Sequence, residues 1–186
     1  MIKDNNISDM LAEWVRYGEG YYGWRHIRYF LFEYEMYLQS NSKAKREKID
    51  WDLFVSENFE NDFSSVEHIY PQKAHDQYWT DRFSKYTQTQ KNALRNSLGN
   101  LLALSKPKNS SLGNKPFSEK RDANPTGYRF GSYSENEVAL CDEWTAKEIL
   151  ERGIKMLEFL EKRWKINIGD RDKKSKALGL VFLIEK

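Results

Sequence analysis

Two short segments constrain the fold of this chain more than any other feature. The first is EHIYPQ, residues 67–72, where β-branched and aromatic residues over about 65–70 are followed by Pro71. Because proline cannot donate a hydrogen bond to a sheet, a strand is expected to end there. The second is LGNLLALSKPKNSSLGN, residues 98–114, whose apolar part predicts another strand over residues 100–104. The two strands are expected to pair as in a hairpin.

A short helix is predicted directly after the second strand. Ser105 is a favoured N-cap residue, Pro107 suits a first helical turn, and Gly113 is favoured just beyond a helix C-terminus. These signals bound a two-turn helix that contains Asn109. The order strand, strand, short helix forms a ββα unit over about residues 64–113.

Longer helices are expected on both sides of this unit. Apolar residues recur at spacings of three and four between Trp24 and Leu38, which predicts an amphipathic helix over about 22–40. The capping-box pattern of Thr145 and Glu148 opens a second helix over about 145–165. The expected fold is therefore mainly α, an α+β architecture with a small ββα motif inserted among helices. The whole chain, residues 1–186, is interpreted as a single domain.

Other segments carry weaker signals. Residues 88–97 are predicted to be helical, and the spacing of Ser134 and Glu137 matches a second capping box. Residues 51–59 indicate a short helix or turn. Near the end of the chain, residues 170–176 are predicted to form a turn or loop, and residues 177–184 a terminal strand.

Composition excludes several classes of protein. The chain has 186 residues, with six Trp, eleven Tyr and ten Phe, which is enough to build a core. Cys141 is the only cysteine, so neither a disulfide framework nor a four-cysteine zinc site is possible, and a reducing cytoplasm is the expected compartment. The N-terminus lacks a signal-peptide pattern, and the longest apolar run, residues 177–184, is too short to span a bilayer. No membrane association is expected.

The predicted unit contains the residue types of a one-metal phosphodiesterase site: an acid, a histidine and two asparagines. Magnesium accepts only one or two protein carboxylates, so a Glu and an Asn carbonyl oxygen suffice. Glu67 and Asn109 can supply that pair, with Asn114 as an alternative to Asn109. Adjacent strand residues point to opposite faces, so Glu67 can reach the metal while His68 addresses the attacking water. His68 is then the candidate general base. One Mg²⁺ or Mn²⁺ per site is expected.

The segment EHIYPQ followed by Asn100 and Asn109 resembles the HNH endonucleases. Their ββα-metal motif carries the acid and the base on a first strand and the remaining ligand on a short helix. The same arrangement occurs in the HNH domains of CRISPR effector nucleases. On this resemblance Glu67 corresponds to the metal-binding acid and His68 to the general base. Asn100 corresponds to the residue that steadies the base, and Asn109 to the second metal ligand.

The wider pattern is similar to the C-terminal nuclease domain of GmrSD-type modification-dependent restriction systems, in which EHIxPQ, LGNLxLL, an Asn-rich helix and PFxxK recur in that order. Here these elements read EHIYPQ, LGNLLAL, NSSLGN and PFSEK, and the likeness covers roughly residues 20 to 165. It implies a metal-dependent endonuclease acting on DNA in restriction or anti-phage defence. Full-length relatives usually begin with a ParB-like nucleotide-hydrolysing domain. Such a domain does not fit in this chain, so a ParB-like domain or subunit is an expected partner.

Positive charge is concentrated around the motif. Residues 82–129 contain ten basic and two acidic residues, a formal charge of +8, whereas the rest of the chain sums to −6. A basic surface beside the site would attract a phosphate backbone, and a merely solvated basic face is the alternative. The predicted phosphate contacts are Lys106, Lys108, Lys115 and Lys120.

Other functions remain open from the sequence. The chain can be a nucleic-acid-binding module with weak or no cleavage, or a domain whose aromatic helices dock a partner subunit. RNA is an alternative substrate. A Ser-His-Asp hydrolase is disfavoured because the chain has no G-x-S-x-G segment, and a phosphate-binding P-loop is absent too.

Overall fold

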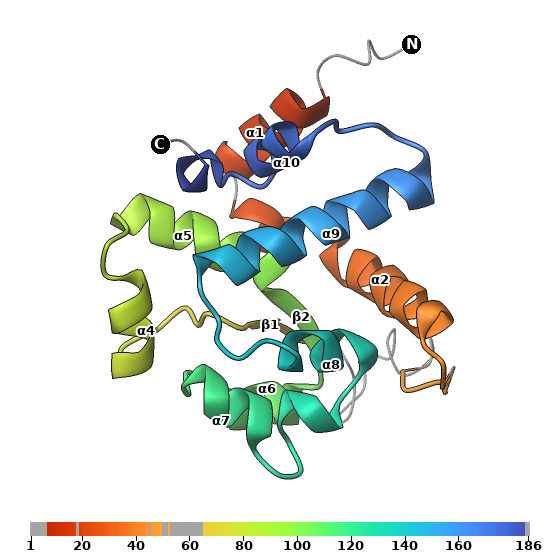
Figure 1. Cartoon of the computed structure of the whole chain (residues 1–186), viewed down its shortest axis with the longest axis vertical. Helices are drawn as coiled ribbons and strands as arrows, with labels where there is room; N and C mark the ends of the chain where they lie inside the picture. The colour runs from red at the N-terminus through yellow and green to blue at the C-terminus, as the bar shows by residue number, and fades with distance from the viewer. Residues whose placement is uncertain (1–6, 18, 45, 50–51, 53–64, 185–186) are drawn as a thin grey trace.

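The computed structural model describes residues 7–17, 19–44, 46–49, 52 and 65–184. Over these ranges the chain is mainly helical, with one two-stranded antiparallel sheet (Figure 1). The expected α+β architecture, mainly α, is confirmed.

The elements follow one another in chain order. The α-helices of the described ranges are α1 (Ile7–Tyr17), α2 (Ile27–Asn41), α4 (Gln77–Phe83), α5 (Gln88–Asn96), α6 (Lys106–Leu112), α7 (Phe117–Asp122), α8 (Tyr133–Ala139), α9 (Ala146–Trp164) and α10 (Arg171–Ala177). The strands are β1 (Ser65–His68) and β2 (Leu101–Leu104), and the short 3₁₀ helices are η2 (Gly20–Gly23), η3 (Leu98–Asn100), η4 (Tyr128–Phe130) and η5 (Val181–Leu183).

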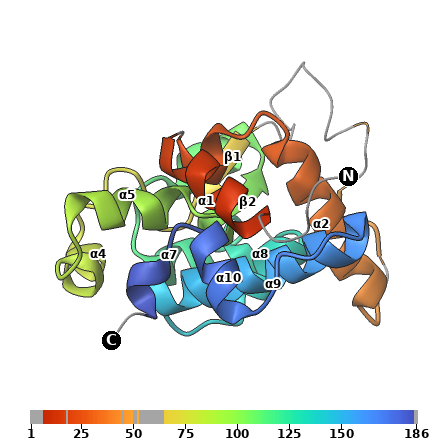
Figure 2. The same ribbon diagram turned by 90° about the horizontal axis from the view of Figure 1, so that it is seen from above.

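The two strands lie at the centre of the molecule with helices around them (Figures 1 and 2). In the antiparallel register Glu67 lies opposite Leu102 and His68 opposite Leu101. All four residues of β2 are buried. Beyond the strand end, the Ile69 amide donates to the Asn100 carbonyl oxygen at 3.0 Å, which continues the pairing. The sheet therefore places Glu67 and His68 on a buried, fixed backbone.

Helix α6 has the ends that the sequence predicts. Ser105 is the N-cap and accepts a hydrogen bond from the Lys108 amide, and Pro107 lies in the first turn. Gly113 ends the helix with φ +48°, a conformation that favours glycine. The two strands pair and α6 follows β2 as predicted, but α4, α5 and η3 lie between β1 and β2, so the pair is not a hairpin. Helix α6 carries Asn109 beside β1.

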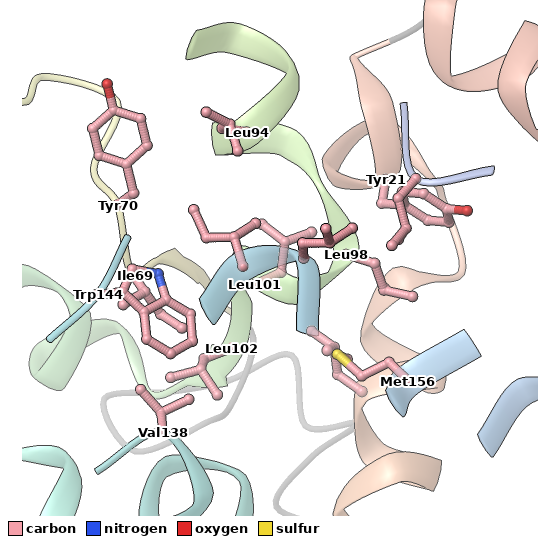
Figure 3. Packing of buried hydrophobic residues seen from close by; sticks show 14 of the residues in the cluster. Tyr21, Ile69, Tyr70, Leu94, Leu98, Leu101, Leu102, Val138, Trp144 and Met156 are labelled. Carbon is pink, nitrogen blue, oxygen red and sulfur yellow. The ribbon is translucent and has the colours of Figure 1, made fainter. Parts of the chain in front are cut away.

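The hydrophobic core forms around β2 (Figure 3). Leu101 and Leu102 are buried there together with Trp144 and Met156. Helix α9 crosses directly over η3, where the backbones meet at Gly99. A Cβ on Gly99 would lie 2.0 Å from the carbonyl oxygen of Ile149, so only glycine permits this approach. Helix α9 thus holds the segment that leads into β2.

The N-terminal flank differs slightly from its prediction. Helix α2 begins at Ile27 rather than near residue 22, because residues 20–23 form the 3₁₀ helix η2 and Gly20 has a positive φ of +59°. Of the predicted apolar face, Ile27, Leu31 and Tyr34 are buried, whereas Trp24 and Leu38 at its two ends are half-buried. Phe30 and Tyr34 contact Phe159 of α9, with ring centroids 5.8 and 5.4 Å apart.

The second predicted capping box is displaced by two residues. The pair that forms it is Ser132 with Glu135, whereas the box of Thr145 and Glu148 is present as predicted. Ser134 instead donates to Glu35, and Glu137 pairs with Arg152 of α9. Tertiary contacts therefore take up the two side chains that the local pattern had assigned to a cap.

The C-terminal predictions are wrong. Residues 170–176 were expected to be a loop, but Asp170 caps α10, which packs against α1. The expected strand over residues 177–184 is absent from the described structure, which has the end of α10 and η5 there. Leu178 and Leu180 are buried by this helix packing and not by a strand partner. The segment 51–59 lies outside the described residues, apart from Asp52. Among the described residues, no helix has both the length and the apolarity needed to cross a membrane.

Candidate active site

A cleft of about 710 Å³ lies along β1, α6 and the segment that leads from η2 into α2. It brings together four of the residues predicted from the sequence, and the alternative ligand Asn114 also lines it. The four predicted residues in the lining are Glu67, His68, Lys106 and Asn109. Residues from a strand and from the following helix therefore converge on one cavity.

The carboxylate of Glu67 is fixed by hydrogen bonds from two buried side chains. Its Oε1 accepts a hydrogen bond from Lys120 Nζ at 2.5 Å and another from the Tyr128 hydroxyl at 3.1 Å. Burial raises the pKa of the Glu67 carboxyl and lowers that of the Lys120 amine, and each charge opposes the shift of the other. Both of these side-chain hydrogen bonds go to Oε1, and neither occupies Oε2, while Glu67 itself lines the cleft.

Lys120 is a correction to the sequence-based prediction. It was expected to contact a phosphate backbone, but it is 0% exposed. Its ammonium group also donates to the carbonyl oxygens of His68 and Ile69, at 3.1 and 3.2 Å. With Glu67, these partners match the three hydrogens of the group. Lys120 is therefore a positioning residue for β1 and cannot reach a substrate.

Lys108 is a second correction. Its ammonium group pairs with the buried carboxylate of Glu135, and Lys108 lines a different cavity with Arg46 and Arg129. Lys106 and Lys115, by contrast, are exposed. Of these two, only Lys106 lines the cleft that contains His68.

His68 is buried between an aromatic ring and an amide. The ring of Tyr22 lies over it, with centroids 4.4 Å apart and planes tilted by 53°. Its Nε2 is 3.2 Å from Oδ1 of Asn96. Because an amide oxygen only accepts, Nε2 carries the hydrogen in this arrangement and Nδ1 keeps a lone pair. Burial lowers the pKa of His68 to about 4, so the imidazole is neutral at pH 7.

Asn100 does not contact the imidazole. Its Oδ1 accepts from the Tyr70 amide at 2.8 Å and from Trp144 Nε1 at 3.0 Å. Its Nδ2 donates to the carbonyl oxygens of Tyr70 and Arg95. The expected direct support of the base by Asn100 is therefore corrected: Asn96 contacts the ring, and Asn100 fixes the backbone two residues beyond His68. Sequence reasoning missed Asn96 because nothing in its spacing distinguishes it from a surface residue of α5.

The oxygen atoms lining the cleft fit a hard cation. Asn109 donates through Nδ2 to the Ser65 hydroxyl, which leaves its Oδ1 as the atom for a metal. Glu67 is the one carboxylate in the described lining of this cleft. Among the described residues, no group of three or more His, Cys, Asp or Glu side chains is placed to hold a metal. A cation here would depend on one carboxylate, one amide oxygen, water and substrate, which is a coordination that Mg²⁺ accepts.

Comparison with known proteins gives one match. No curated protein and no solved structure matches the chain significantly. A family model described as the C-terminal domain of GmrSD restriction endonucleases matches residues 2–159. This match covers most of the chain, including both strands, α6 and every residue that lines the cleft. The chain therefore belongs to the family of C-terminal domains of GmrSD restriction endonucleases.

Proposed function

We propose that this chain is a single HNH nuclease domain that uses a divalent metal ion to hydrolyse phosphodiester bonds of DNA in restriction or defence against phage. The observation that carries the proposal is the convergence of Glu67, His68 and Asn109 on one cleft. Membership of a restriction endonuclease family supports the same conclusion. A ParB-like nucleotide-hydrolysing domain or subunit is the partner that fits such a system.

In the proposed reaction, His68 is the general base. Its neutral imidazole accepts a proton at Nδ1 from the attacking water as the new P–O bond forms and the bond to the leaving oxygen breaks. Asn96 keeps the ring in the required tautomer through its hydrogen bond to Nε2. Tyr22 covers one side of the ring and limits its rotation.

Glu67 and Asn109 would hold the metal through Oε2 and Oδ1. When bound, Mg²⁺ or Mn²⁺ supplies charge that stabilises the negative charge developing on the phosphate. The chain's own contribution is to keep both ligands fixed: Lys120 and Tyr128 anchor the carboxylate, and Ser65 orients the amide.

The proposal is tested by incubating the purified protein with supercoiled plasmid and Mg²⁺ or Mn²⁺, with EDTA in a parallel reaction. The expected result is conversion to nicked or linear DNA with either metal and full inhibition by EDTA. RNA of matched sequence in the same buffer reports the substrate class. Cleavage that persists unchanged in EDTA would contradict a metal-dependent mechanism, and degradation of RNA alone would contradict DNA as the substrate.

A further inference from the structure

The cleft has a second wall that lies outside the ββα unit. It is formed by the segment from the end of η2 into the first turn of α2, from which Tyr22, Arg25 and Arg28 line the cavity. We propose that this wall binds the DNA strand beside the scissile phosphate, with Arg25 of the wall and Lys106 of α6, on the other side of the cleft, each contacting a backbone phosphate. The inference rests on the proposed function, because it extends the substrate site of the same nuclease.

Charge within the cleft supports a phosphate-bearing ligand. The lining contains the cationic side chains of Arg25, Arg28 and Lys106 and one acid, Glu67. That acid is already paired with Lys120 behind the cleft wall. With Glu67 paired in this way, the charges of Arg25 and Lys106 give the cavity a positive character, which attracts an anion such as a phosphodiester.

Arg25 and Lys106 are placed to make such contacts. Both are exposed, and among the described residues neither forms an ion pair. Arg25 donates through Nε to Nε2 of the neighbouring His26 at 2.7 Å, which restrains the guanidinium group. Lys108, in the same helix as Lys106, has its charge taken up by Glu135 and faces another cavity. The two side chains available to bind phosphate, Arg25 and Lys106, therefore lie on opposite sides of the same cleft.

Tyr22 connects this wall to the catalytic histidine. Its ring lies 4.4 Å from the ring of His68, yet 37% of Tyr22 remains exposed. A strand whose phosphate reaches His68 must therefore pass beside Tyr22, whose free surface can pack against a sugar or base. The cavity, at about 710 Å³, is large enough for more than a single phosphate group.

The test is DNA binding by inactive His68→Ala protein, measured by fluorescence anisotropy at several salt concentrations with two duplexes of unrelated sequence. Arg25→Gln and Lys106→Gln should each flatten the plot of log affinity against log salt by about 0.9, equally for both duplexes. Arg25→Lys should keep the slope. Lys155→Gln, which removes an exposed charge from α9 away from the cleft, should leave it unchanged. Thermal melting of every variant confirms that the fold is retained.

The outcomes separate this inference from the proposed function. If wild-type protein cleaves plasmid but Arg25→Gln binds with unchanged slope and affinity, the wall is not a substrate surface and the inference is overturned, while the nuclease assignment stands. If wild-type protein fails to cleave but Arg25→Gln flattens the slope as expected, the wall binds DNA and only the nuclease assignment fails. A slope that changes equally in Lys155→Gln, or no measurable binding to either duplex, also overturns the inference.

Discussion

The ammonium group of Lys120 lies 2.5 Å from Oε1 of Glu67, although both side chains are almost fully excluded from solvent. Lys120 belongs to α7 and Glu67 to β1, so the pair joins two elements far apart in the sequence. The same ammonium group binds the carbonyl oxygens of His68 and Ile69. One buried side chain therefore fixes both the proposed metal ligand and the strand end that carries the proposed base.

Lys120→Met is expected to destabilise the fold strongly, because it leaves the buried Glu67 carboxylate without its partner. Breaking a buried ion pair from one side typically costs about 3–5 kcal/mol. Urea denaturation followed by circular dichroism measures the change. Lys115→Met, at an exposed site, is the matched control and should stay within about 0.5 kcal/mol. The double variant with Glu67→Gln should lose less than the sum of the two single changes. A loss below about 1 kcal/mol in Lys120→Met would show that the pair does not hold β1.

Asn96→Ala is expected to slow cleavage while DNA binding is retained. Its amide orients the His68 ring, and removal of such an orienting partner typically costs about 10- to 100-fold in activity. Asn96→Asp, which still accepts from Nε2, should retain more activity than Asn96→Ala. Asn100→Ala should behave differently and lose stability, because it leaves buried groups of Tyr70 and Trp144 without partners. Single-turnover rates and melting temperatures of the variants decide the assignment, and wild-type rates in Asn96→Ala would refute it.

Gly99→Ala is expected to disrupt the contact between η3 and α9. The added Cβ would lie 2.0 Å from the Ile149 carbonyl oxygen and 2.6 Å from the Gly153 amide nitrogen, and neither backbone atom can move freely. We expect a loss of at least about 2 kcal/mol, at the upper end of overpacking effects. Gly113→Ala is the comparison for backbone strain without a clash, since its nearest neighbour would be 3.5 Å away and only its φ of +48° with ψ of −131° is strained, at a cost of about 1–3 kcal/mol. A Gly99→Ala protein that melts at the wild-type temperature would contradict the packing described for Gly99.

Asn109→Ala is expected to raise the Mg²⁺ concentration needed for half-maximal cleavage, because it removes one of very few protein ligands. Manganese should restore its activity better than magnesium. Binding of Mn²⁺, followed by electron paramagnetic resonance, should give one site per chain in the wild type and weaker binding in the variant. Asn114→Ala, which lies in the same cleft, should change both curves little. The reverse order of effects would identify Asn114 as the ligand.

The ββα arrangement was predictable because its signals are local. Pro71 marks the end of β1, and Ser105 and Gly113 mark the two ends of α6, each through the conformation of its own backbone. The capping box that opens α9 is local in the same sense. The local capping pattern of Ser134 failed because its side chain hydrogen-bonds Glu35 of α2 and therefore does not cap the helix.

The partners of the site residues could not be predicted, because they depend on contacts between distant segments. Lys120 in the sequence is a charged residue in a basic stretch, which normally indicates a solvated surface. Only the packing of α7 against β1 buries it beside Glu67. The charged residues 170–176 were predicted to form a loop for the same reason. They form a helix instead, in which Lys174 is buried and pairs with Glu161 of α9.

The most direct test of the account is the single-turnover rate of plasmid cleavage by His68→Ala at saturating Mg²⁺, compared with wild type and with His75→Ala, an exposed histidine outside the cleft. Loss of a general base typically lowers the rate by a factor of about 10² to 10⁴. We expect that loss in His68→Ala, with DNA affinity and melting temperature nearly unchanged, and a wild-type rate in His75→Ala. A His68→Ala protein that keeps more than about a tenth of the wild-type rate would contradict the assignment of His68 as the base.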